Sequence, residues 1–112
     1  MPLVKFFGVP EITPEGACTK FKSMVRETIA AIPEMNLTID EISVLLIPEV
    51  CFDNEIHIEA TFNDRPERTP DVREKLAIAV TKVTAEFFKN AKLIEFWGNP
   101  FKKEQGFADF RR

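Results

Sequence analysis

Side chains that bind metals or form disulfides are scarce in this sequence. It contains two cysteines and one histidine, His57, among 112 residues. The isolated cysteines Cys18 and Cys51 make neither a disulfide framework nor a zinc motif. We therefore expect no metal and no cofactor, and a reduced cytoplasmic setting is the default expectation.

The sequence also lacks a long hydrophobic run and an excess of positive charge. No stretch approaches the ~18 apolar residues that a membrane span needs, and the first residues do not have the pattern of a secretory signal. The formal net charge is −3, which argues against binding to nucleic-acid phosphates or to an anionic membrane. We expect neither nucleic acid nor membrane as a partner.

The composition is that of a folded chain. Apolar residues make up 45% and charged residues 29%, with 11 phenylalanines and no tyrosine. A chain of this length fits a single domain, residues 1–112. Within it we expect two pseudo-repeats, about 2–50 and 55–98, followed by a tail, 99–112.

The first pseudo-repeat reads as strand, helix and strand. Residues 2–9 form an apolar run that ends at a glycine and a proline. Thr13-Pro14-Glu15 then has the residues favoured at a helix start, with Thr as the N-cap. Apolar residues recur at helical spacing until Pro33 stops the helix. Residues 42–48 are predicted to form the second strand.

The second pseudo-repeat has the same order. Residues 55–62 alternate between apolar and polar side chains, which predicts a half-buried strand. Thr69-Pro70-Asp71 opens a second helix in the same way as the first, and residues 92–97 give a fourth strand. Each unit allows parallel strand pairing through a crossover helix. The sequence therefore predicts an α+β fold with a four-stranded sheet and both helices on one face.

The other face of that sheet needs a cover. The second strand is apolar on both sides, because Leu45 and Ile47 alternate with Val44 and Leu46. In so short a chain, another copy of the protein is the favoured cover. The alternative is that the phenylalanine-rich tail folds back over this face.

Two short motifs, together with the duplicated order, resemble the tautomerase superfamily. Pro2 follows the initiator Met1 and begins a strand, and Arg68-Thr69 is followed by Arg73 at a helix start. The superfamily includes the 4-oxalocrotonate tautomerases, macrophage migration inhibitory factor and the 5-carboxymethyl-2-hydroxymuconate isomerases. An uncharacterised bacterial family is also similar. The resemblance covers residues 2 to about 98 and implies a homotrimer with an active site near each Pro2.

The sequence departs from the family pattern in two places. Family members commonly carry an arginine near the start of the second strand, where it holds a substrate carboxylate. Residues 40–43 read Asp-Glu-Ile-Ser here, with no arginine. The tail after Gly98 matches no family pattern.

Pro2 is the candidate catalytic residue. After removal of Met1 it would carry a secondary amine, and an unperturbed terminal amine titrates near ~8. Burial would lower that pKa by penalising the ammonium form. A neutral amine can take a proton from carbon beside a carbonyl and return it elsewhere, which is a keto–enol tautomerisation. The alternative is that Pro2 only begins a strand, and with Met1 retained its nitrogen is an amide.

Four cationic residues are candidate substrate-binding groups. Arg65, Arg68 and Arg73 lie near one loop and helix start, where guanidinium groups could hold a carboxylate. The resemblance singles out Arg68. Lys5 lies on the first strand near Pro2 and could lower the pKa of its ammonium. The alternatives are a solvated helix start with acidic neighbours and a surface lysine.

Three functions remain open. The first is a tautomerase-like isomerase that acts on a small carboxylated substrate with Pro2 as general base. The second is a non-catalytic trimer that keeps the fold for binding or scaffolding. The third is a ferredoxin-like module, which has the same element order but an antiparallel sheet.

His57 is expected on the polar side of its strand, as an acid, a base or an interface residue.

Overall fold

The fold is known from a computed structural model that describes residues 2–11, 13–49, 51 and 53–112. The described residues form four strands, two α-helices and three short 3-10 helices. In chain order these are β1 (Leu3–Pro10), α1 (Glu15–Ala30), η1 (Pro33–Met35), η2 (Ile39–Glu41), β2 (Ser43–Glu49), β3 (Glu55–Asn63), α2 (Pro70–Phe87), β4 (Leu93–Phe101) and η3 (Lys103–Gln105). The predicted α+β order is confirmed.

The four strands form one mixed sheet in the order β2-β1-β3-β4. β1 pairs with β2 in parallel and β3 pairs with β4 in parallel, so each strand–helix–strand unit contributes two neighbouring strands. The two units join where β1 runs antiparallel to β3. The parallel pairs exclude the ferredoxin-like alternative, in which the sheet is antiparallel throughout.

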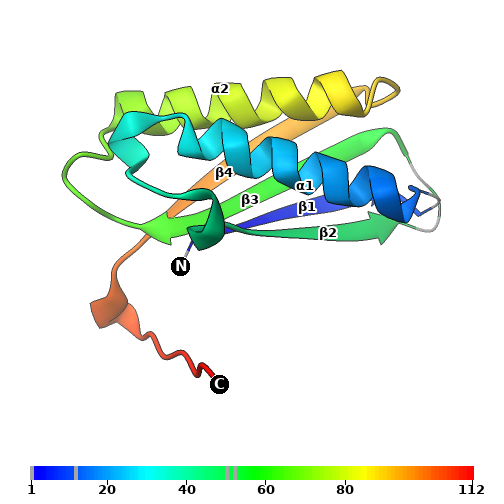
Figure 1. The fold of residues 1–112 in the computed structure, drawn as a ribbon. Coiled ribbons are helices and arrows are strands. Elements are labelled where there is room, and N and C mark those ends of the chain that lie inside the picture. The colour runs from blue at the N-terminus through cyan, green and yellow to red at the C-terminus, as the bar shows by residue number, and fades with distance from the viewer. Residues whose placement is uncertain (1, 12, 50, 52) are drawn as a thin grey trace.

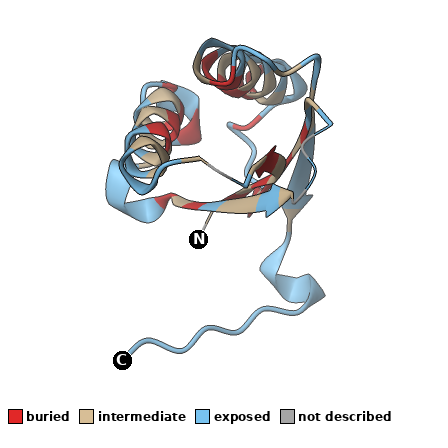
Figure 2. Cartoon of the chain, turned by 90° about the vertical axis from the view of Figure 1, so that its right-hand side faces the viewer, coloured by how far each residue is buried: buried red, intermediate tan, exposed pale blue. Residues whose placement is uncertain are grey.

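Both helices cover the same face of the sheet, as predicted (Figure 1). The core lies between the two layers, where Figure 2 shows the buried residues gathered. Strand alternation explains this core, because every second residue of β3 from Ile56 to Phe62 is buried. Phe21 of α1 is completely buried and packs edge-on against Phe6 of β1, with ring centroids 5.0 Å apart.

The two helix starts differ, which corrects one expectation. Thr69 caps α2 as predicted, since its hydroxyl accepts a bond from the Val72 amide and Pro70 is the first helical residue. Thr13 does not cap α1. Its hydroxyl donates to the carbonyl of Pro10 at 2.7 Å, and Pro14 is the N-cap instead. The Thr13 hydroxyl is used in the turn that leaves β1, so the same three-residue pattern gives two local structures.

The tail extends away from the body of the molecule (Figures 1 and 2). β4 continues to Phe101, beyond the predicted end at residue 97, and residues 102–112 are exposed. The alternative that the tail folds back over the sheet is therefore wrong within a single chain. Leu45 of β2 and Trp97 of β4 remain exposed on the uncovered face, at 46% and 58%. No helix in the described part of the chain is long and apolar enough to cross a membrane.

Candidate active site

A cavity of about 260 Å³ lies beside the start of β1. Its lining comes from four separate segments of the chain. The lining residues are Pro2, Leu37, Asp40, Glu41, Asn63, Arg65, Arg68, Lys103 and Arg111. The cavity thus brings together Pro2 and two of the predicted arginines.

Strand pairing explains why these distant segments meet. The parallel register places Leu3 beside Ser43, and the Ser43 amide donates to the carbonyl of Pro2 at 3.0 Å. The antiparallel register places Thr61 beside Leu3, so the loop that follows β3 emerges next to Pro2. β4 runs parallel to β3 and its last residue, Phe101, pairs with Asn63. The tail therefore leaves the sheet beside the loop that follows β3, at the end of the sheet where β1 begins.

Arg68 is almost fully buried, at 3% exposure. Its Nη1 donates to the carbonyl of Asn63 at 2.7 Å, and its Nη2 donates to the carbonyl of Met35 at 2.6 Å. The Nε atom is buried without a hydrogen-bond partner among the described residues. Burial lowers the pKa of the guanidinium, and the nearby charge of Arg65 lowers it further. An anion bound beside the Arg68 guanidinium would offset the unfavourable burial of its charge.

Two carboxylates share the cavity with the cations. The Glu41 carboxylate accepts hydrogen bonds at Oε1 from the Thr38 amide at 2.9 Å and from the Thr38 hydroxyl at 3.1 Å. These bonds lower the pKa of Glu41 and keep it ionised at neutral pH. Asp40 is exposed beside it. Acids therefore occupy the segment where an arginine was expected from the resemblance.

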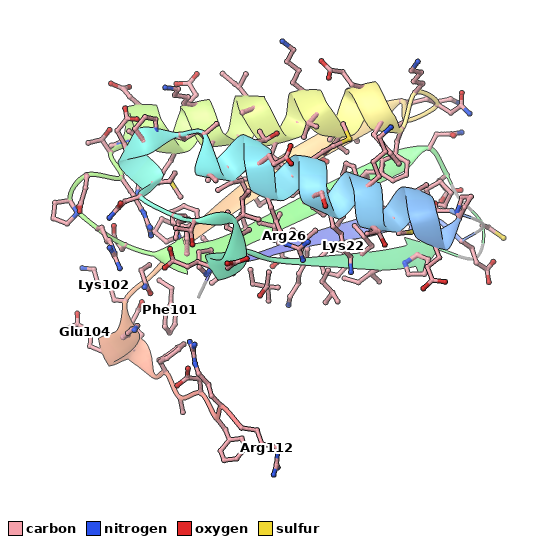
Figure 3. The ribbon with its side chains drawn as sticks, viewed as in Figure 1. Lys22, Arg26, Phe101, Lys102, Glu104 and Arg112 are labelled. Atoms are coloured by element: carbon pink, nitrogen blue, oxygen red, sulfur yellow. The ribbon has the colours of Figure 1, made fainter. Side chains whose placement is uncertain are left out.

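A second hollow of about 520 Å³ adjoins the cavity. The two share Asn63, Arg65 and Lys103. Phe101, Lys102 and Glu104 also line this hollow, and Figure 3 shows them at the root of the tail. Arg65 is exposed and lies where the two spaces meet.

The other two predicted cations lie outside the cavity lining. Lys5 projects from β1 on the uncovered face, in register with Leu45 and Glu59. Arg73 lines a separate hollow with Phe62 and Phe96 among its neighbours. The structure therefore brings Arg65 and Arg68 to Pro2, but not Arg73 or Lys5.

Lys103 and Arg111 are cavity residues that the sequence reasoning missed. The tail matches no family pattern, and no motif marks these two cations. The available signal was topological. If β4 runs parallel to β3, the residues after β4 must emerge beside the loop after β3, where Arg65 and Arg68 lie.

His57 lies on the uncovered face between two acids. Its Nε2 is 3.6 Å from Oε1 of Glu55, and its Nδ1 is 3.4 Å from Oε1 of Glu95. Cys18 has its sulfur 3.8 Å from the carbonyl of Thr13. Among residues 2–11, 13–49, 51 and 53–112, no group of three or more His, Cys, Asp or Glu side chains could hold a metal ion.

Comparisons of sequence find no match, either to a family model or to a curated protein. Solved structures do match. A fused 4-OT wild-type asymmetric trimer has a TM-score of 0.71 at 8% identity, covering 92% of this chain and 87% of that chain. A macrophage migration inhibitory factor-like protein from Entamoeba histolytica has a TM-score of 0.67 at 12% identity, with 96% and 93% coverage.

A domain of unknown function (DUF1904) from Sebaldella termitidis is also similar. Its TM-score is 0.65 at 18% identity, and the match covers 97% of this chain and 96% of that chain. Identities this low show a shared fold and not a shared activity. The strand order, the two helices on one face and these matches agree, so the chain has the fold of the tautomerase superfamily.

Proposed function

We propose that this chain is a tautomerase-like isomerase that interconverts the keto and enol forms of a small carboxylated substrate, with Pro2 as the general base. One observation carries the proposal: Pro2 lines the same cavity as Arg65 and Arg68. We further propose that the working form is a homotrimer. The uncovered sheet face, with Leu45 and Trp97 exposed, supports an assembly.

The chemistry requires that Met1 be removed. Met1 lies outside the described residues, so its removal is a condition of the proposal. The freed nitrogen of Pro2 would be a secondary amine whose direction is fixed by the ring. The cations of the cavity lining disfavour the ammonium form, whereas Asp40 and Glu41 favour it; four cations face two acids in this lining.

The proposed reaction moves one proton in two steps. The Pro2 nitrogen takes a proton from the carbon beside the substrate carbonyl, so that a C–H bond breaks and an N–H bond forms. The electron pair moves to the carbonyl oxygen and gives an enolate. The Pro2 ammonium then protonates that oxygen and releases the enol, and the reverse sequence restores the ketone.

Arg65 and Arg68 would hold the carboxylate and the developing oxyanion. Arg68 has an unpartnered buried Nε among the described residues, and an anion could supply the missing acceptor. Arg65 is exposed at the mouth and could approach the other end of the substrate. Charge that develops on the enolate oxygen is stabilised best by donors already in place.

A non-catalytic binding protein of the same fold is the second candidate. Asp40 and Glu41 in the cavity wall favour it, because two carboxylates repel a carboxylate substrate. In this alternative the cavity would bind a ligand without turning it over, and substitution of Pro2 would leave binding intact.

The test is the keto–enol conversion of phenylpyruvate by protein whose processed amino terminus is verified by mass spectrometry. We expect turnover, and we expect Pro2→Ala to lower kcat/KM by about 10²-fold or more. Lys82→Ala is the control, since Lys82 is an exposed lysine of α2 and does not line the cavity. Absence of turnover in the processed protein, with phenylpyruvate still bound, would favour the second candidate.

A further inference from the structure

We propose that the C-terminal tail, residues 102–112, completes the Pro2 cavity, and that Lys103 and Arg111 are specificity-determining residues that select a carboxylated substrate. The inference rests on the proposed function for the identity of the site. It assigns a role to the one segment that matches no family pattern. Both side chains line the cavity beside Pro2.

The tail is anchored where it leaves the sheet. The Asp64 amide donates to the carbonyl of Phe101 at 2.8 Å, which joins the root of the tail to the loop that carries Arg65 and Arg68. Lys102 then begins a turn in which its amide donates to the Gln105 side chain at 3.0 Å. This turn, η3, places Lys103 at the cavity and at the adjoining hollow.

Local contacts orient the two tail cations. The ammonium of Lys103 lies 4.9 Å from the ring centroid of Phe107, a cation–π contact. The Phe107 ring in turn lies 6.5 Å from that of Phe101 at the root of the tail. The Arg111 Nε is 2.9 Å from a carboxylate oxygen of Asp109, so Asp109 orients the guanidinium and partly offsets its charge.

The charge balance of the cavity depends on the tail. Without the tail, two cations of the body, Arg65 and Arg68, face the two acids, Asp40 and Glu41, and the lining has no net charge. The tail adds two cations to this lining. Only the complete cavity thus favours an anion, in a protein whose formal net charge is −3. The tail cations replace, from another segment, the arginine that residues 40–43 lack.

A purely structural role would predict a different outcome. If Lys103 and Arg111 only neutralised the acids, their removal would leave the affinity for the substrate unchanged. Residues 102–112 are exposed, and exposed ion pairs contribute little to stability. A change in KM with an unchanged melting temperature therefore separates the two roles.

The experiment compares two double variants of the full chain. Lys103→Ala with Arg111→Ala removes the cations that line the cavity. Lys102→Ala with Arg112→Ala is the matched control, because it removes the same charges from neighbouring positions that do not line the Pro2 cavity. Figure 3 shows Lys102 at the root of the tail and Arg112 at its tip.

We expect the first variant to raise KM for phenylpyruvate roughly three- to tenfold, with kcat and the melting temperature nearly unchanged. The increase should shrink at high salt, because exposed charges are screened. The control variant should keep the KM of the unmodified protein. Equal effects in the two variants, an unchanged KM, or a fall in melting temperature that accompanies the change would overturn the inference.

The experiment can distinguish failure of the tail inference from failure of the isomerase proposal. If the full chain lacks turnover, calorimetric binding of phenylpyruvate replaces KM as the readout. Binding that weakens only in the Lys103 and Arg111 variant would support the tail inference while the isomerase proposal fails. Turnover that is insensitive to that variant would overturn the tail inference alone.

Discussion

The side chain of Arg68 joins two segments that are far apart in the sequence. Its guanidinium bonds to carbonyls of Met35 in η1 and Asn63 at the end of β3, while the charge itself is almost completely buried. The resemblance had indicated a ligand-binding role for this residue. The hydrogen bonds add a structural role, because a backbone carbonyl that is buried without a donor is unfavourable.

Substitution of Arg68 should therefore affect stability as well as binding. We expect Arg68→Ala to lower the free energy of unfolding by roughly 3 kcal/mol, since two charge-assisted hydrogen bonds are lost and two backbone carbonyls lose their donor. Relief of the buried charge offsets only part of this loss. Arg68→Lys should recover only part of this, because an ammonium does not have the geometry of the guanidinium fork. Urea denaturation measures both values, with exposed Lys82→Ala as control. A loss below about 0.5 kcal/mol for Arg68→Ala would contradict the structural role.

The sequence identified some of the residues that line the cavity. Pro2 and Arg68 were marked by the resemblance, and Arg65 by its position in the same loop. Arg73 was marked by the same motif, yet it is the fourth residue of α2, whereas Arg68 precedes the helix, and it lines a different hollow. Lys103 and Arg111 carry no local signal, since their place in the cavity depends on the path of the chain after β4.

Among the elements, β1 contains an irregularity at Gly8. The pairing register with β2 shifts between Phe7 and Val9, and Gly8 has a φ of 86°. A Cβ atom added there would clash with the backbone carbonyl oxygen of Glu55. Glycine is the residue that adopts this backbone conformation without steric penalty.

Two glycine substitutions should have opposite effects. Gly8→Ala is expected to lower the free energy of unfolding by about 2 kcal/mol or more, because it adds left-handed strain and a backbone clash. Gly16 lies in the first turn of α1, and an added Cβ would meet no atom within 4 Å. Gly16→Ala should therefore raise stability by about 0.5 kcal/mol. Thermal unfolding of the pair tests this, and a Gly8→Ala protein as stable as the unmodified one would refute it.

Element types were predictable, and their ends less so. Hydrophobic periodicity and the prolines at the helix starts located both helices and all four strands. Thr13 failed as a cap because its hydroxyl bonds back to Pro10, a local competition that the residue pattern does not reveal. β4 continued past its apolar run through Gly98 and Pro100, because pairing with β3 holds these residues extended.

On the scale of the whole molecule, one face of the sheet is left without a helical layer. In register across this face lie Leu45 of β2, Lys5 of β1, Glu59 of β3 and Trp97 of β4. Apolar side chains on the two outer strands thus flank two residues of opposite charge, Lys5 and Glu59, on the central strands. Such a mixed surface is typical of an interface whose polar groups find partners on assembly.

A charge at the apolar edge of this face should disrupt the proposed trimer. We expect the unmodified protein to have three times the 12.8 kDa chain mass by light scattering, and Leu45→Asp to shift it toward the monomer. Ile78→Asp is the matched control, because Ile78 is 61% exposed on α2 and lies on the helical side. Circular dichroism verifies that both variants fold. A monomeric unmodified protein, or equal dissociation by the two variants, would rule out this face as the interface.

The exposure of the tail phenylalanines could not be predicted from the sequence. Its phenylalanines suggested burial, yet Phe107 and Phe110 are exposed and each lies against a cation of the tail itself. Composition alone does not distinguish an aromatic that packs on a core from one that pairs with a neighbouring cation.

The order of the strands also has a consequence for how far the sheet could grow. β2 and β4 are the outermost strands, and each carries an exposed proline near its carboxyl end, Pro48 and Pro100. A proline has no amide hydrogen, so an incoming strand from another molecule would lose a bond of its ladder at each of these positions. Extension of the sheet from one molecule to the next through its outer strands is thereby disfavoured. Copies of the chain can still meet through the uncovered face of the sheet.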